Sequence, residues 1–134
     1  MGLDNGFVVH GLKHKDIPSF VKLPMPISEY HDNSDTVEIA YYRKCWGLRD
    51  AILGVLHAHH SGGDFRVEAE DIPAIINVIR PFFSEEYWND EGDSIWSFAE
   101  AFNYMLVQQT INLQWLHSYM TVHPEVTCYF YDSY

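Results

Sequence analysis

The sequence predicts an α+β fold in which a small, mainly antiparallel sheet is covered on one face by about three helices. Short apolar or alternating segments and longer segments of helical spacing follow one another in the order β-β-α-β-α-α-β, which favours this layered arrangement. The chain has 134 residues, of which 47% are hydrophobic and 16% aromatic, enough for one domain with a substantial core. We therefore expect a single domain over residues 1–134.

Two strands are expected in the N-terminal part. Residues 3–12 carry β-formers such as Phe7 and Val9, and residues 36–43 alternate in polarity. The alternation predicts that Val37, Ile39 and Tyr41 face one side of the second strand, and that Glu38, Ala40 and Tyr42 face the other. Residues 13–34 hold three prolines and several charges, a composition typical of a long loop, here with a helical turn at 17–22.

The middle of the chain predicts a helix, a strand and a second helix. Residues 46–59 have helical spacing, and residues 65–69 alternate as a short strand. Asp71 is expected to begin the next helix, with Pro73 in its first turn where a missing N–H costs nothing. Four isoleucines at helical spacing, Ile72, Ile75, Ile76 and Ile79, predict its buried face.

The C-terminal part predicts the longest helix and a final strand. The helix is expected to begin at residue 93 or 94 and to run towards Val122, before Pro124. Residues 126–134 alternate as a strand. One side of it carries Thr127, Tyr129 and Tyr131, and the other carries Cys128, Phe130 and Asp132.

Charge is distributed unevenly along the chain. The net charge is −11, and no Lys or Arg follows Arg80, so the last 54 residues carry −8 and the first 80 carry −3. Such a field opposes direct binding to nucleic acid or to anionic membranes and favours a basic protein surface as partner. No apolar run is long enough to span a bilayer, and the N-terminus lacks the pattern of a signal peptide. We expect a cytoplasmic protein.

Cysteine usage agrees with a reducing compartment. Cys45 and Cys128 are far apart in sequence and form no metal or redox motif. Two buried thiols are expected, and the alternative is a disulfide that joins the last strand to the region of Cys45.

Three segments carry a family resemblance. Met1-Gly2-Leu3-Asp4, the run Ala40-Tyr41-Tyr42-Arg43-Lys44 and the segment 65–72 resemble a group of small uncharacterised phage and bacterial proteins that begin Met-Gly-Leu-Asp and carry Tyr-Trp-Arg-Lys at a strand end. Here Tyr42 replaces the Trp. The resemblance implies a shared α+β domain and a phage or prophage setting, in the cytoplasm of a bacterial host, and it brings no activity.

The segment 84–93 predicts a protein-binding surface, because two large aromatic side chains stand among five carboxylates. We expect a non-enzymatic acidic binding module, and in the phage setting an inhibitor of a host nucleic-acid-binding defence enzyme. Its carboxylates would stand where phosphates normally lie. The expected contact residues are Glu85, Glu86, Tyr87, Trp88, Asp90, Glu91 and Asp93. No catalytic motif appears, so no catalytic residue and no cofactor are assigned.

Two alternatives remain open from the sequence. The first is a small anionic-ligand or metal-binding domain or enzyme, centred on Tyr42, Arg43 and Lys44 and on the histidine cluster 57–60, where His57 and His60 share a helix face. The same residues also have a purely structural explanation, in which the histidines end a helix and Arg43 forms an ion pair with Asp4. The second is a homo-oligomer that pairs through an exposed edge strand at residues 129–131.

Overall fold

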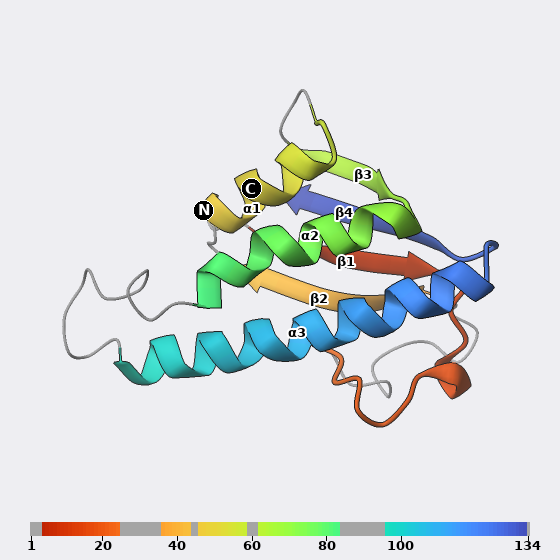
Figure 1. Ribbon diagram of the computed structural model, residues 1–134, viewed down its shortest axis with the longest axis horizontal. Helices are drawn as coiled ribbons and strands as arrows, with labels where there is room; N and C mark the ends of the chain where they lie inside the picture. The colour runs from red at the N-terminus through yellow and green to blue at the C-terminus, as the bar shows by residue number, and fades with distance from the viewer. Residues whose placement is uncertain (1–3, 25–35, 44–45, 59–61, 84–95, 134) are drawn as a thin grey trace.

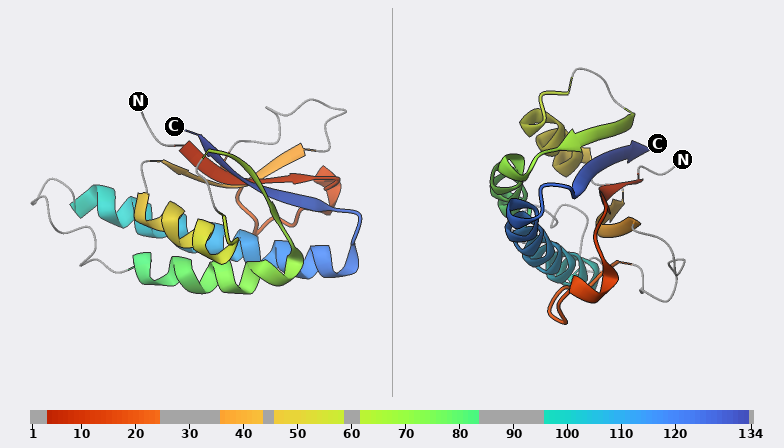
Figure 2. Two further views of the ribbon diagram at one scale, coloured as in Figure 1. Left: turned by 90° about the horizontal axis from the view of Figure 1, so that it is seen from above. Right: turned by 90° about the vertical axis from the view of Figure 1, so that its right-hand side faces the viewer.

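The computed structural model describes residues 4–24, 36–43, 46–58, 62–83 and 96–133, with the backbone alone at 43, 46, 83 and 96–105. It is an α+β fold, as predicted: a four-stranded antiparallel sheet with three α-helices on one face (Figures 1 and 2). The order of strands and helices along the chain is also the predicted one.

The sheet has the strand order β2-β1-β4-β3. Its strands are β1 (Asp4–His10), β2 (Thr36–Arg43), β3 (Gly63–Val67) and β4 (Thr127–Ser133), and every neighbouring pair is antiparallel. The strand β4 lies between β1 and β3, so its backbone is paired on both sides. The alternative in which residues 129–131 form an exposed edge is therefore wrong, because the edge strands of the described sheet are β2 and β3.

The predicted sidedness of β2 is correct only in its first half. A β-bulge shifts the register between Phe7 and Val8: Phe7 pairs with Ala40, whereas Val8 pairs with Glu38. Ile39 is the extra residue, and it reverses the faces that follow it. Ala40 and Tyr42 consequently join the helix-covered core, fully buried. The bulge turns Tyr41 to the opposite face, where its hydroxyl meets Asp4 on β1.

Three helices cover one face of the sheet: α1 (Trp46–Val55), α2 (Ile72–Ile79) and α3 (Trp96–Val122). Short 3-10 segments accompany them, namely η1 (His14–Asp16), η3 (Ala69–Asp71) and η4 (Arg80–Phe83). The helical turn predicted at 17–22 is thus found earlier, at η1. Helix α1 ends before the predicted residue 59, since His57 already has a positive φ of 54°.

Helix α2 follows the predicted isoleucine pattern. All four of its isoleucines are buried, and each buried side chain of this size contributes about 1.5–3 kcal/mol. Ahead of it, the backbone N–H of Glu68 donates to Asp71 Oδ2 at 2.9 Å, within a capping box that encloses η3. The sequence Glu68–Asp71 thereby fixes the turn from β3 into the helix layer.

The core lies between the sheet and the helices, and its largest fully buried side chains include Tyr42, Phe7, Phe130 and Leu106. Cys128 is also in this layer, as a free and buried thiol. Burial raises its pKa to about 12, so the thiol stays protonated at neutral pH. Cys128 is therefore a buried thiol, as predicted, and it forms no disulfide. Cys45 lies outside the described residues.

A buried ion pair fastens α1 to the centre of the sheet. Arg49 Nε and Nη2 donate to Asp132 Oδ1 and Oδ2 at 3.0 and 2.8 Å, and the Gly62 N–H donates to Asp132 Oδ2 at 2.8 Å. Burial raises the pKa of Asp132, but the hydrogen bonds from Arg49 and Gly62 and the charge of Arg49 outweigh it, and the net pKa lies below the usual value. The carboxylate is therefore held ionised inside the protein.

Candidate binding site on the helix-free face of the sheet

The second face of the sheet carries the candidate site. All three helices lie on the opposite face (Figure 2), and alternate residues of each strand point away from them. On β4 these outward residues are Thr127, Tyr129 and Tyr131, which are half-buried, whereas their neighbours Cys128, Phe130 and Asp132 are buried. The predicted sidedness of the last strand is thus confirmed, and it sets two tyrosines on the helix-free face.

Two tyrosine hydroxyls on this face donate short hydrogen bonds to carboxylates. Tyr131 Oη donates to Glu38 Oε1, and Tyr41 Oη donates to Asp4 Oδ1, both at 2.6 Å. The net pKa of Glu38 lies above its usual value. Burial raises this pKa most, the hydrogen bond from Tyr131 lowers it, and the negative charge of Asp4 raises it further. Burial and the bond to Glu38 also raise the pKa of the Tyr131 hydroxyl. Both bonds are charge-assisted and fix the tyrosine rings in place.

Glycine is required at position 6, where these interactions converge. Gly6 is the cross-strand partner of Tyr41 on β2 and of Tyr131 on β4. A Cβ atom there would overlap the carbonyl oxygen of Ala40 and lie 3.1 Å from Tyr131 Oη. The missing side chain lets Tyr131 reach across β1 to its carboxylate on β2.

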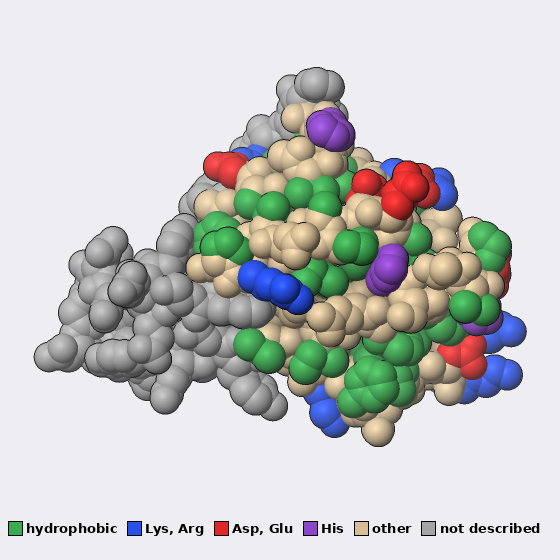
Figure 3. Space-filling model, viewed as in Figure 1, with side chains coloured by type: hydrophobic (Ala, Val, Ile, Leu, Met, Phe, Trp, Pro, Cys, Tyr) green, Lys and Arg blue, Asp and Glu red, His purple; other side chains and the backbone are tan. Residues whose placement is uncertain are grey.

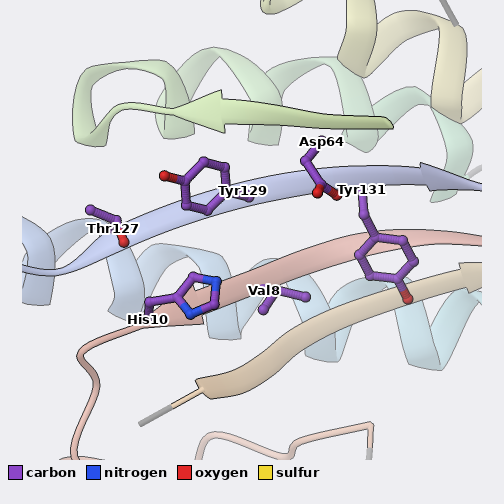
Figure 4. Close-up of a pocket in the computed structure, with 6 residues that line it drawn as sticks. All are labelled: Val8, His10, Asp64, Thr127, Tyr129 and Tyr131. Atoms are coloured by element: carbon purple, nitrogen blue, oxygen red, sulfur yellow. The ribbon is translucent and has the colours of Figure 1, made fainter. Parts of the chain in front are cut away.

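A hollow of about 500 Å³ opens beside Tyr131 (Figure 4). Its walls also include His10, whose Nδ1 lies 3.1 Å from Thr36 Oγ1 and whose ring meets the Tyr129 ring edge-on, with centroids 5.6 Å apart. Such contacts orient aromatic rings. The lining comes from three strands and comprises Val8, His10, Asp64, Thr127, Tyr129 and Tyr131.

Carboxylates outnumber fixed positive charges among the described side chains of this face. Asp4 and Glu38 are engaged by the tyrosines, whereas Asp64 is exposed and has no ion pair or hydrogen bond with any described residue. Among the described side chains, Arg66 supplies the fixed positive charge of this face. It is the cross-strand partner of Tyr129, and the Nε atom of Arg66 lies 3.4 Å from Glu68 Oε1. The hollow therefore holds one carboxylate whose charge is available to a ligand.

The helix-covered face differs in character. Figure 3 shows hydrophobic side chains gathered over α3 and few acidic ones, and the exposed apolar residues include Phe20, Val107 and Ile111. Asp132 belongs to neither surface, because it is buried against Arg49. The predicted acidic surface of the C-terminal part thus loses this carboxylate, while Glu125 stays exposed, 3.3 Å from His123 Nδ1.

The residues predicted to bind a partner or a metal are only partly described. The acidic, aromatic segment 84–93 lies outside the described residues, as do Lys44 and His60. The backbone of Arg43 ends β2 directly opposite Asp4, the register that their expected ion pair requires. His57 is exposed, and within the described ranges no three His, Cys, Asp or Glu side chains are grouped as metal ligands.

Tyr42, predicted as a ligand contact, is instead a core residue. It is fully buried, and its ring packs edge-on against Phe7 with centroids 6.3 Å apart. The bulge at Ile39 is the cause, since it turns Tyr42 towards the helices. The sequence already placed the tyrosines that line the hollow on the polar side of the last strand. It did not indicate that Glu38 and Asp64 lie beside these tyrosines, because only the strand register brings them there.

Comparisons with known proteins find no matching family, curated protein or solved structure. Among the described residues, no helix combines the length and the apolar character needed to cross a membrane. On the helix-free face, aromatic rings and the carboxylates bonded to them surround a hollow, a composition suited to contact with a positively charged group.

Proposed function

We propose that this protein is a non-enzymatic binding module that presents the helix-free face of its sheet to a basic partner protein. The observation that carries the proposal is the hollow between Tyr129 and Tyr131, on whose wall the carboxylate of Asp64 has no partner among the described residues. Tyrosines are enriched at protein interfaces because they bury much area with few rotatable bonds. The net charge of −11 adds a long-range attraction for a basic surface.

The resemblance to phage proteins supplies the proposed setting. In it, the partner is a host nucleic-acid-binding defence enzyme, whose basic groove ordinarily contacts phosphates. The acidic segment with Glu85, Glu86, Tyr87 and Trp88 forms a second contact in this proposal, continuing the negative charge of the molecule. An acidic protein that fills such a groove inhibits the enzyme by excluding nucleic acid.

The test begins with affinity capture from a bacterial host lysate at low salt, followed by measurement of the captured protein's affinity at increasing salt. We expect affinity to fall steeply as salt is added, because the attraction between the two charged surfaces is screened. Equal affinity at low and high ionic strength would exclude the electrostatic basis of the proposal.

Two charge-reversal variants locate the binding face. Asp64→Lys changes the hollow, and Glu70→Lys makes the same change of charge at an exposed residue of η3. We expect Asp64→Lys to weaken binding at least about tenfold, because it places a like charge against a basic surface. Glu70→Lys is expected to have only the small effect of the altered net charge. Equal effects of the two variants would show that the hollow is not the binding site.

A further inference from the structure

We infer that the hollow between Tyr129 and Tyr131 is a recognition pocket for a single arginine side chain of the basic partner. This inference rests on the proposed function and adds the chemical identity of the bound group. The hollow, at about 500 Å³, is within the range of roughly 300–1,000 Å³ of ligand-binding clefts. It has room for a long side chain together with part of its backbone.

The aromatic walls attract a cation. Tyr129 and Tyr131 project from the same side of β4, and Asp64 on β3 is the cross-strand partner of Tyr131 (Figure 4). A cation over the face of a tyrosine is attracted by the negative charge of the ring face. The hydroxyl of Tyr131 donates to Glu38 at 2.6 Å, and this bond makes the ring more electron-rich, which strengthens its attraction for a cation.

The carboxylate of Asp64 selects a guanidinium group among cations. It is exposed, lines the hollow, and has no described partner, so both of its oxygens are available. A guanidinium is planar, stacks on aromatic rings and donates two parallel hydrogen bonds to a carboxylate, which an ammonium group does not do. An arginine side chain therefore satisfies the rings and the carboxylate at the same time.

Two positively charged or chargeable groups oppose binding: His10, which lines the hollow, and Arg66, which lies next to the lining residue Tyr129 on the neighbouring strand. Arg66 is the cross-strand partner of Tyr129, and Glu68 lies 3.4 Å from its Nε. His10 contacts the Tyr129 ring by its edge and lies within hydrogen-bond distance of Thr36. The cation in the pocket must therefore bind in spite of Arg66, and removal of that charge by Arg66→Gln should tighten binding.

The pocket is tested by NMR titration of the whole protein with N-acetyl-arginine amide, a probe that requires no partner. We expect saturable shifts of the backbone amides of Val8, Asp64 and Tyr129, with weaker binding of N-acetyl-lysine amide. Tyr129→Ala should lower the affinity for the arginine probe about fivefold, and Asp64→Asn should lower it by a similar factor. Tyr119→Ala, the same truncation on α3, should leave it unchanged.

The outcomes separate this inference from the proposed function. If the arginine probe gives no saturable shift, or if lysine binds equally well, the arginine pocket is excluded even where Asp64→Lys still weakens the partner. If Tyr129→Ala is poorly folded, Asp64→Asn decides, because Asp64 is exposed and the substitution removes only its charge. Unchanged affinity in Asp64→Asn would exclude the guanidinium–carboxylate contact.

Discussion

Removal of the charge at Asp132 should destabilise the protein more than any other charge change among the described residues. Asp132→Asn keeps the size of the side chain but leaves the Arg49 guanidinium buried beside a neutral amide. The wild-type pair is bidentate, at 3.0 and 2.8 Å, and the Asp132 side chain has 0% exposure. Solvent therefore cannot replace the lost partner.

The size of the effect follows from this burial. Removal of one partner of a buried ion pair costs about 3–5 kcal/mol, a large part of the roughly 5–15 kcal/mol by which a domain is stable. Unfolding entropy of about 2.1 cal/mol/K per residue gives roughly 0.28 kcal/mol/K for 134 residues. The expected fall in Tm is therefore about 11–18 °C.

Urea unfolding and calorimetry measure the effect, with Asp50→Asn as the matched control. Asp50 also accepts from Arg49, at 2.9 Å, but its side chain is 66% exposed, so its loss should cost less than about 1 kcal/mol. The double variant Arg49→Met/Asp132→Leu should recover stability relative to Asp132→Asn, because no buried charge is left alone. A loss below 1 kcal/mol in Asp132→Asn would refute the reasoning.

The same pair predicts acid sensitivity. The pKa of Asp132 is lowered in the folded protein, so its contribution is fully present above the usual value of 3.8 and is lost as pH falls through the folded pKa. The stability difference between wild type and Asp132→Asn should therefore shrink below pH 3.8.

Three further predictions concern other sites. Gly6→Ala should cost about 3 kcal/mol in urea unfolding, because its Cβ would overlap the backbone of β2, whereas Gly54→Ala in α1 meets no atom within 4 Å and should gain about 0.5–1 kcal/mol. The raised pKa of Glu38 means that its carboxyl group holds a proton more tightly in the folded protein than in the unfolded protein. Stability from Glu38 should thus fall as pH rises from 4.5 through the folded pKa, and Glu38→Gln should remove this slope. Buried Cys128, whose pKa is about 12, should react with iodoacetamide at pH 8 only in the unfolded protein, as measured by peptide mapping that separates it from Cys45; rapid labelling of Cys128 in the native protein would contradict its burial.

The parts of the fold that depend on local pattern were predictable from the sequence. The isoleucines of α2 repeat at helical spacing and are all buried, and the alternation of residues 127–132 gave the correct faces of β4. In both elements the side-chain period follows from backbone geometry alone. The bulge at Ile39 interrupts this period, and the residues of β2 carry no Gly or Pro that would mark it. The faces of Tyr41 and Tyr42 were therefore assigned the wrong way round.

The candidate site depends on pairings that local pattern does not contain. Tyr131 and Glu38 are 93 positions apart, and Asp64 reaches the hollow through the register of β3 with β4. The ion pair of Arg49 and Asp132 did leave a signal in the sequence. An acidic residue on the apolar side of a predicted strand requires a buried basic partner, but the sequence does not identify which arginine supplies it.

The position of β4 has a consequence for how the chain acquires its structure. The strands β1 and β3 leave the ribosome well before β4, yet β4 is the strand that joins them. Until it is synthesised, the inner edges of both strands are exposed to other chains, and β3 has no described neighbour in the sheet. The sheet is therefore completed only when residues 127–133 are available, and long-range pairings of this kind form slowly and leave incomplete chains prone to aggregation.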